Sequence, residues 1–260
     1  MGTNFSIHRC LPGLVFALTC TLFLMSIPGI SVSGEVHVAV ASNFGQAIRL
    51  ISERFEEATG HEVVLSFGST GKHYAQIRNG APFHVFLAAD TERPMRLEKE
   101  GLAEPGSRFT YAVGSLVLWS PRPGFVDTDA NILKTGSFRR LAVANPKLAP
   151  YGKAAREVLL AQGLWETLQN RMVRGENIGQ TFQFVASGSA ALGFVAFSQI
   201  KRPDRPIGGS YWEVPQVLYT PIEQQAVLLR GDNPVARAFL SFMRQDESLR
   251  IIRGFGYGTP

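Results

Sequence analysis

Short apolar runs typical of buried strands alternate in this chain with longer segments whose apolar residues recur at helical spacing. The first run covers residues 36–41. The apolar residues that follow it recur every three or four positions: Phe44, Ala47, Ile48, Ile51, Phe55 and Ala58. Gly60 then ends the helical pattern, as glycine commonly does one residue beyond a helix. Because parallel strands need a crossover between them, this alternation predicts right-handed βαβ units in an α/β fold.

The same alternation continues toward the end of the chain. We expect further strands over residues 63–65, 85–88, 111–119, 141–145, 192–197 and 225–229. Helical patterns occupy the intervening segments: residues 74–79, the segment that begins at Asp90, residues 152–162, the segment that begins near Asn177, and the segment after Asn233-Pro234. The sequence has no internal repeat, low-complexity tract or long linker, so short crossings would join any two lobes.

Two polar turns lie where a predicted strand ends and a helical pattern begins. Residues 41–44 contain Ser42 and Asn43, and residues 68–71 contain Ser69 and Thr70. A helix N-terminus binds anions through its free backbone N–H groups and the positive end of its dipole. Taken singly, each turn is explained as an N-cap, for which Ser, Thr and Asn are preferred. Because ligands bind at the carboxyl ends of parallel strands, the two turns together predict one anion site.

Residues 1–34 have the pattern of a secretory signal peptide. A histidine and an arginine precede an uncharged apolar stretch over residues 11–27, and small residues near position 34 offer cleavage sites. A retained membrane anchor is the alternative. Cys10 and Cys20 both lie in this segment, so the exported protein would have no disulfide, and lipidation of Cys20 stays open. We therefore predict a periplasmic protein.

The rest of the chain, about 226 residues, is long enough for one large domain or two α/β lobes. The chain has 26 lysines and arginines, one of them in the predicted signal peptide, and 21 aspartates and glutamates, so the exported protein has a net charge of about +4. This modest excess favours an anionic ligand. Because the basic residues form no run or stripe, the sequence does not predict nucleic-acid binding.

Several motifs that would indicate an enzyme are incomplete. Residues 68–72 read Gly-Ser-Thr-Gly-Lys, but a phosphate-binding loop needs four residues between its glycines and Ser or Thr after the lysine. The histidines are scattered without the HExxH spacing of a zinc site. Residues 188–190 lack the G-x-S-x-G frame of a nucleophilic serine. Asp90 is better explained as a helix cap or hinge contact than as a catalytic carboxylate. The sequence therefore predicts neither a catalytic residue nor a cofactor.

Seven short segments carry a specific combination of motifs. They are VAVASNF (38–44), SFGSTG (66–71), YAQI (74–77), NGAP (79–82), VFLAAD (85–90), GSLVL (114–118) and LAVANP (141–146). In this order and spacing they resemble the periplasmic molybdate-binding proteins that deliver oxyanions to ABC-type importers. The resemblance covers most of the mature chain, and its specificity lies in the combination of the segments.

This resemblance implies a two-lobed periplasmic binding protein fold of type II. Each lobe would be a mostly parallel sheet flanked by helices, the chain would cross between the lobes twice, and the ligand would lie in the cleft. We expect residues 35–112 and 222–260 to form lobe 1 and residues 113–221 to form lobe 2.

The resemblance also implies which residues bind the anion. In the first lobe they are the hydroxyl of Ser42 and the neighbouring Asn43 in the first turn, and the hydroxyl of either Ser69 or Thr70 in the second turn. In the second lobe they are two backbone donors, one after the Asn-Pro turn and one at a helix start. These positions correspond to Ser42, Asn43, Ser69 or Thr70, Tyr151, and Ile178. We expect Asn43 to offer backbone and amide donors, and the choice between Ser69 and Thr70 stays open.

Two departures from the family are linked in our interpretation. Many members have a small residue where this chain has Tyr151, and a tyrosine where it has Ala196. We hypothesise that the Tyr151 hydroxyl enters the pocket from a different loop and replaces the missing donor. The alternative is that Tyr151 only covers the surface of its lobe.

A pocket of neutral donors suits molybdate or tungstate. An oxyanion without bound protons offers only acceptors, whereas a protonated phosphate needs an acceptor in return. Sulfate is smaller, so a rigid cage built for the larger ions would leave it out of contact. The resemblance thus implies a monomeric receptor that hands molybdate or tungstate to a permease with a cytoplasmic ATPase. The alternatives are a receptor for sulfate or a small carboxylate, and an enzyme on the same fold.

Overall fold

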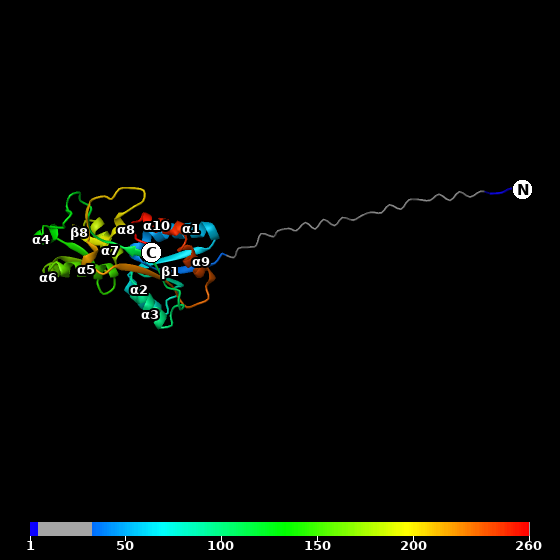
Figure 1. The fold of residues 1–260 in the computed structure, drawn as a ribbon, viewed down its shortest axis with the longest axis horizontal. Helices are drawn as coiled ribbons and strands as arrows, with labels where there is room; N and C mark the ends of the chain where they lie inside the picture. Colours follow the sequence, from blue (N-terminus) through cyan, green and yellow to red (C-terminus); the bar gives the residue numbers. More distant parts are fainter. Residues whose placement is uncertain (5–32, 260) are drawn as a thin grey trace. The chain divides into compact units, whose positions relative to one another are not determined.

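Two five-stranded sheets form the framework of the protein, for which a computed structural model describes residues 1–4 and 33–259 (Figure 1). The first sheet has the strand order β2 (Glu62–Gly68), β1 (Glu35–Ala41), β3 (Val85–Leu87), β10 (Ile222–Leu228) and β4 (Phe109–Gly114). The second has the order β7 (Met172–Gly175), β6 (Leu141–Ala144), β8 (Leu192–Ala196), β5 (Leu116–Ser120) and β9 (Ser210–Glu213). Nearly all of the predicted signal peptide and anchor segment lies outside the described residues.

Helices cover both faces of each sheet. On the first sheet, α1 (Gly45–Thr59), α9 (Pro234–Phe242) and α10 (Asp246–Gly254) pack on one face, and α2 (Thr70–Arg78) and α3 (Glu92–Lys99) pack on the other. On the second sheet, α4 (Ile132–Thr135), α5 (Pro150–Ala161) and α6 (Trp165–Leu168) pack on one face, and α7 (Ile178–Ala186) and α8 (Phe197–Ile200) pack on the other. Three short 3-10 helices complete the described elements: η1 (Ser42–Phe44), η2 (Gln169–Arg171) and η3 (Gln216–Leu218). No helix of this part of the chain is long and apolar enough to cross a membrane.

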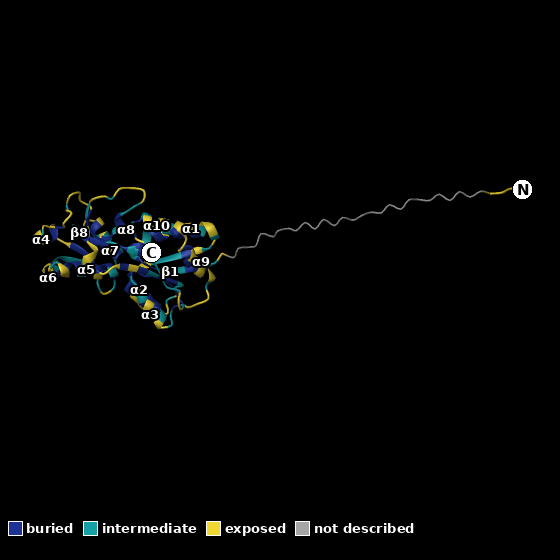
Figure 2. Ribbon diagram, viewed as in Figure 1, coloured by how far each residue is buried: buried dark blue, intermediate teal, exposed yellow. Residues whose placement is uncertain are grey.

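The apolar runs of the sequence are strands that are buried on both faces. Along β1, Val38 and Val40 belong to the core under α1 and α9, whereas Ala39 belongs to the core under α2 and α3. All three side chains are inaccessible to solvent, and Figure 2 shows buried residues throughout both sheets. A strand between two helical layers must be apolar at successive positions, which is why it reads as a continuous run.

Each sheet contains one reversed strand, and that strand is the first one the chain enters after it leaves the other sheet. The chain leaves the first sheet after Gly114 and enters β5, which runs antiparallel to β8 and β9. It returns after Glu213 and enters β10, which runs antiparallel to β3 and β4. The remaining neighbours pair in parallel. The two sheets are therefore mixed, with most strands in each running in one direction.

Three predictions about individual elements need correction. The predicted single strand over residues 111–119 was wrong, because Ser115 separates β4 from β5 in different sheets. The helix predicted over residues 74–79 begins earlier, at Thr70, and the strand predicted over 225–229 begins earlier, at Ile222. The exact lobe boundaries, at 112/113 and 221/222, stay predictions, although pairing with β10 keeps β4 in the first sheet as far as Gly114.

Candidate functional site

A small cavity of about 10 Å³ lies between the carboxyl ends of strands from the two sheets. Its walls are Ala41, Ser42, Asn43, Gly68, Ser69, Thr70, Ala89, Ala149, Pro150, Tyr151, Asn177 and Ile178. Every binding residue predicted from the sequence is among them, although the two sheets contribute these residues from segments far apart in the chain. The space between these walls is narrow, and the hydrogen bond from the N–H of Gly179 to Ser42 shows that the two lobes meet at this site.

Four helices begin at this cavity. The segment η1–α1 follows β1, α2 follows β2, α5 follows the turn after β6, and α7 follows β7. The first backbone N–H groups of a helix have no partner within it, and the helix dipole places partial positive charge there. Thr70, Tyr151 and Ile178 each lie in such a first turn. The site can therefore bind an anion through backbone donors alone.

The N-cap interpretation of the polar residues also holds, and it explains why the helices begin where they do. Ser69 has extended backbone geometry, and its hydroxyl accepts a hydrogen bond from the N–H of Lys72 at 3.3 Å. Asn177 has the same role in α7, where its side-chain oxygen Oδ1 accepts a hydrogen bond from the N–H of Gln180 at 2.9 Å. The N–H groups of Gly71 and Gly179 are paired with Leu148 and Ser42, so the first N–H of each helix, at Thr70 and at Ile178, is the one left for a ligand.

The two candidate hydroxyls of the second turn have similar surroundings. Both Ser69 and Thr70 are buried. Thr70 Oγ1 accepts a hydrogen bond from the N–H of Ala89 at 3.0 Å. Because Ser69 Oγ and Thr70 Oγ1 act as acceptors in these bonds, each hydroxyl keeps its own hydrogen for donation to a ligand. The choice between them stays open.

Ser42 connects the two lobes. Its hydroxyl accepts a hydrogen bond from the N–H of Gly179 at 3.0 Å and donates one to Asn177 Oδ1 at 3.1 Å. Neither Asn177 nor Gly179 was predicted to contribute to the site. Asn177 could have been predicted from the sequence, because it follows a strand and caps a helix, as the polar residues of the two first-lobe turns do. Gly179 has no such signal, because its role depends on packing against Ser42.

The prediction for Asn43 is corrected in one respect. Its side-chain amide donates to Gln224 Oε1 at 2.7 Å and to the Tyr257 hydroxyl at 3.0 Å. Both amide hydrogens are therefore used inside the protein, and only the backbone N–H of Asn43 can serve an anion. Asn43 Oδ1 is buried, and it has no hydrogen-bond partner among the described residues.

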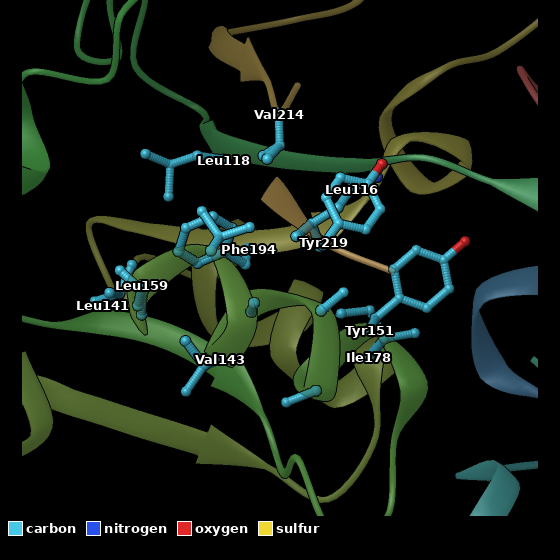
Figure 3. Packing of buried hydrophobic residues seen from close by; sticks show 14 of the residues in the cluster. Leu116, Leu118, Leu141, Val143, Tyr151, Leu159, Ile178, Phe194, Val214 and Tyr219 are labelled. Atoms are coloured by element: carbon cyan, nitrogen blue, oxygen red, sulfur yellow. The ribbon is translucent and has the colours of Figure 1, made fainter. Parts of the chain in front are cut away.

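Tyr151 is only 1% exposed, and its hydroxyl contacts Gln224 of the first sheet. Figure 3 shows its ring at the edge of the second-lobe core, with the hydroxyl pointing away from the apolar side chains. The hydroxyl accepts a hydrogen bond from Gln224 Nε2 at 3.3 Å, and burial raises the pKa of Tyr151 well above its ordinary value. The group is therefore a neutral hydroxyl at physiological pH. Ala196 is fully buried in β8 and is not part of the cavity wall.

Charged side chains surround the cavity without lining it. Among the described residues, the wall contains no lysine, arginine, histidine, aspartate or glutamate. Lys72 pairs with Glu176 of the other lobe at 3.0 Å, with both side chains about half exposed. No group of three His, Cys, Asp or Glu side chains in the described part of the chain could hold a metal ion.

A wider cleft of about 590 Å³ adjoins the small cavity and shares Ala89, Ala149 and Pro150 with it. Asp90 lines this cleft, accepts a hydrogen bond from the N–H of Arg93 at 3.0 Å and pairs with the guanidinium of the same residue. Burial raises the pKa of Asp90, and the neighbouring Arg93 opposes that rise. Arg93 also donates to the carbonyl of Lys147 at 3.3 Å, so Asp90 supports both a helix start and a contact between the lobes.

Comparison with known proteins agrees with this geometry. Residues 36–258 match the family described as bacterial extracellular solute-binding protein. The molybdate-binding protein ModA of Azotobacter vinelandii is 52% identical over 228 residues, covering 87% of this chain and 90% of the relative. ModA of Rhodobacter capsulatus is 47% identical over 243 residues, covering 93% and 95%. The structure of the periplasmic molybdate-binding protein of Azotobacter vinelandii superimposes with a TM-score of 0.84 and 44% identity, covering 86% of this chain and 99% of that one.

Proposed function

Since the chain belongs to the bacterial extracellular solute-binding proteins, and within them to the molybdate-binding proteins, we propose that it captures molybdate or tungstate and delivers it to an ABC-type importer. The observation that carries the proposal is the convergence of helix N-termini from both lobes on one cavity without charged side chains. We propose Ser42, Asn43, Ser69 or Thr70, Tyr151 and Ile178 as the residues that bind the anion.

Neutral donors are sufficient for a dianion in such a site. The backbone N–H groups of Tyr151 and Ile178 and the hydroxyls of Ser69 and Thr70 present hydrogens from several directions. Because the donors belong to closed lobes, the anion would be held only while the cleft is shut. Closure would thus signal occupancy to the importer through a difference in affinity between open and closed forms.

Selection against other anions follows from size and protonation. Sulfate has shorter bonds to oxygen than molybdate, so a cage sized for the larger ion leaves its donors too distant. The oxygen of Asn177 already accepts hydrogen bonds from Ser42 and Gln180, so it is not available to a proton on a bound phosphate. Asn43 Oδ1 is the remaining buried acceptor in the loop, which makes phosphate the most informative competitor.

We further propose a periplasmic location, export by the predicted signal peptide, and a monomeric receptor without enzymatic activity or cofactor. The relatives named above are binding proteins, and one is described as periplasmic. The proposed partners are the importer's permease and its cytoplasmic ATPase. A turnover assay against organic anions would test for an enzyme directly.

Calorimetric titration of the exported form, residues 35–260, tests the ligand. After the protein has been stripped of anions, molybdate, tungstate, sulfate and phosphate are titrated in separate runs. We expect one-to-one binding of the first two and no heat of binding from the other two. Sulfate binding of equal strength would contradict the size argument, phosphate binding would contradict the protonation argument, and four silent titrations would overturn the receptor proposal.

A further inference from the structure

Gln224 is a polar side chain that the proposed function does not use, although it is fully buried between the lobes. It lies on β10, where the pairing with β4 shifts by one residue between Gln224 and Gln225. A buried amide is costly unless its groups are paired, and Gln224 is paired at both ends. Its Oε1 accepts from Asn43 and shares the hydrogen of the Tyr111 hydroxyl with the carbonyl of Ala88, and its Nε2 donates to Tyr151.

A backbone carbonyl fixes the directions of the hydrogen bonds that join Tyr257, Asn43 and Gln224. The carbonyl oxygen of Asn43 can only accept, so the Tyr257 hydroxyl must donate to it, at 2.8 Å. The Tyr257 oxygen then accepts from Asn43 Nδ2 at 3.0 Å. The same nitrogen donates to Gln224 Oε1 at 2.7 Å, which leaves Gln224 Nε2 facing Tyr151.

The consequence is a defined polarity for the Tyr151 hydroxyl. Because Gln224 Nε2 donates to its oxygen, the hydrogen of Tyr151 must point away from Gln224. Among the described residues, none accepts that hydrogen. Tyr151 lines the anion cavity, and a fully deprotonated oxyanion there offers only acceptors.

We propose that Gln224 is a positioning residue that makes the Tyr151 hydroxyl an obligatory donor toward the bound oxyanion. The proposal rests on the proposed function and extends it to a residue outside the cavity wall. Gln224 belongs to the first sheet and Tyr151 to the second lobe, so their bond exists only when the lobes are closed. Closure and donor orientation are thereby linked.

Gly114 provides the space that this contact needs. A Cβ at Gly114 would overlap the Tyr151 hydroxyl oxygen and would lie 2.7 Å from Gln224 Nε2. Gly114 is the last residue of β4, just before the chain crosses to the other sheet. A side chain at this position would push the two partners apart without removing either of them.

A double-mutant cycle on the exported protein, with molybdate titrated by calorimetry, tests the proposal. We expect Gln224→Met to weaken binding about tenfold or more when Tyr151 is present, and less than threefold in the Tyr151→Phe background. A structural role of Gln224 would lower affinity equally in both backgrounds, and that result would overturn the proposal. Failure of the unmodified protein to bind molybdate would instead overturn the proposed function.

Gly114→Ala gives a second test that keeps both partners. We expect it to weaken molybdate binding in the protein with Tyr151, and to do so less in the Tyr151→Phe background, where the overlapping oxygen is gone. Equal losses would again contradict the proposal. Thermal unfolding of each anion-free variant shows whether it is folded, and Tyr219→Phe serves as a matched control, because that buried hydroxyl accepts from the N–H of Leu116 outside the cavity wall.

Discussion

The hydroxyl of Ser42, at the end of β1, accepts a hydrogen bond at 3.0 Å from the backbone N–H of Gly179, in the first turn of α7. This contact joins the first sheet to a helix of the second lobe. A Cβ at Gly179 would lie 3.1 Å from the Ser42 Cβ, which is tighter than most such contacts. The close approach of these two residues therefore helps to define the closed form.

Ser42→Ala should weaken molybdate binding by about 1–3 kcal/mol, because the N–H of Gly179 would lose its acceptor and the closed form would lose a contact between the lobes. Calorimetric titration measures the change. Ser189→Ala is the matched control, since Ser189 is exposed on the second lobe and should leave the affinity unchanged. An affinity of Ser42→Ala equal to that of the control would contradict the role of Ser42.

Thr70→Val should lower the free energy of unfolding by about 1–3 kcal/mol, because the buried N–H of Ala89 would lose its acceptor. Ser69→Ala should lower the free energy of unfolding by less, about 0.5–2 kcal/mol, because the capping hydrogen bond that it removes is long, at 3.3 Å. Urea unfolding of both variants without anion measures these values, and the reverse order would be inconsistent with the two contacts. Molybdate titration of the same variants then identifies which hydroxyl of the second turn binds the anion.

Tyr151→Phe should weaken oxyanion binding by about 1–3 kcal/mol if its buried donor reaches the ligand. Tyr219→Phe should destabilise the fold, because the N–H of Leu116 would lose its partner, but should leave the dissociation constant unchanged. Titration of both variants with molybdate compares a buried tyrosine of the cavity wall, Tyr151, with one outside the wall, Tyr219. An unchanged dissociation constant for Tyr151→Phe would rule out the hydroxyl as a ligand.

His73 should make the fold sensitive to acid. It is 3% exposed, its ring lies 3.2 Å from the carbonyl of Val40, and burial lowers its pKa below the ordinary 6.5. The unfolded chain therefore binds a proton at a higher pH than the folded protein. The resulting stability is complete above about pH 6.5 and decreases as the pH falls from there toward the folded pKa, by at most about 1.4 kcal/mol per pH unit.

Urea unfolding between pH 7.5 and 5.5 tests this dependence. Burial also lowers the pKa of His84, so His84 contributes to the pH dependence in the same direction. The contribution of His73 is therefore measured by comparing the unmodified protein with a His73 variant. We expect His73→Gln to be less stable overall but to lose less stability on acidification than the unmodified protein. Parallel curves for the two proteins would show that His73 does not titrate on unfolding.

The positions of the binding residues could be predicted because they are tied to local patterns. Ser42 and Ser69 each follow an apolar run and precede a helical one, and both features depend on near neighbours in the sequence. Parallel strands place such turns at the same edge of a sheet. Tyr151 and Ile178 could be placed through the resemblance to a family, not through any local pattern of their own.

The hydrogen-bond partners could not be predicted in the same way. The Asn43 amide bonds to Gln224, which is 181 positions away, and the Ser42 hydroxyl bonds to Gly179, 137 positions away. A sequence pattern records the spacing of neighbours along one strand or helix, and it carries no information about which distant group a side chain faces. For this reason the sequence predicts an Asn43 amide that binds the anion, whereas in the structure that amide donates to Gln224 and Tyr257.

The sequence by itself determined the alternation of strands and helices and the polar turns at the strand ends, because burial on two faces and helix capping act over a few residues. Only the tertiary structure decided that the apolar run over residues 111–119 divides between two sheets at Ser115, and that Gln224 is buried beside Tyr151. Both outcomes depend on long-range strand pairing and on lobe closure, which bring together groups that no local pattern connects.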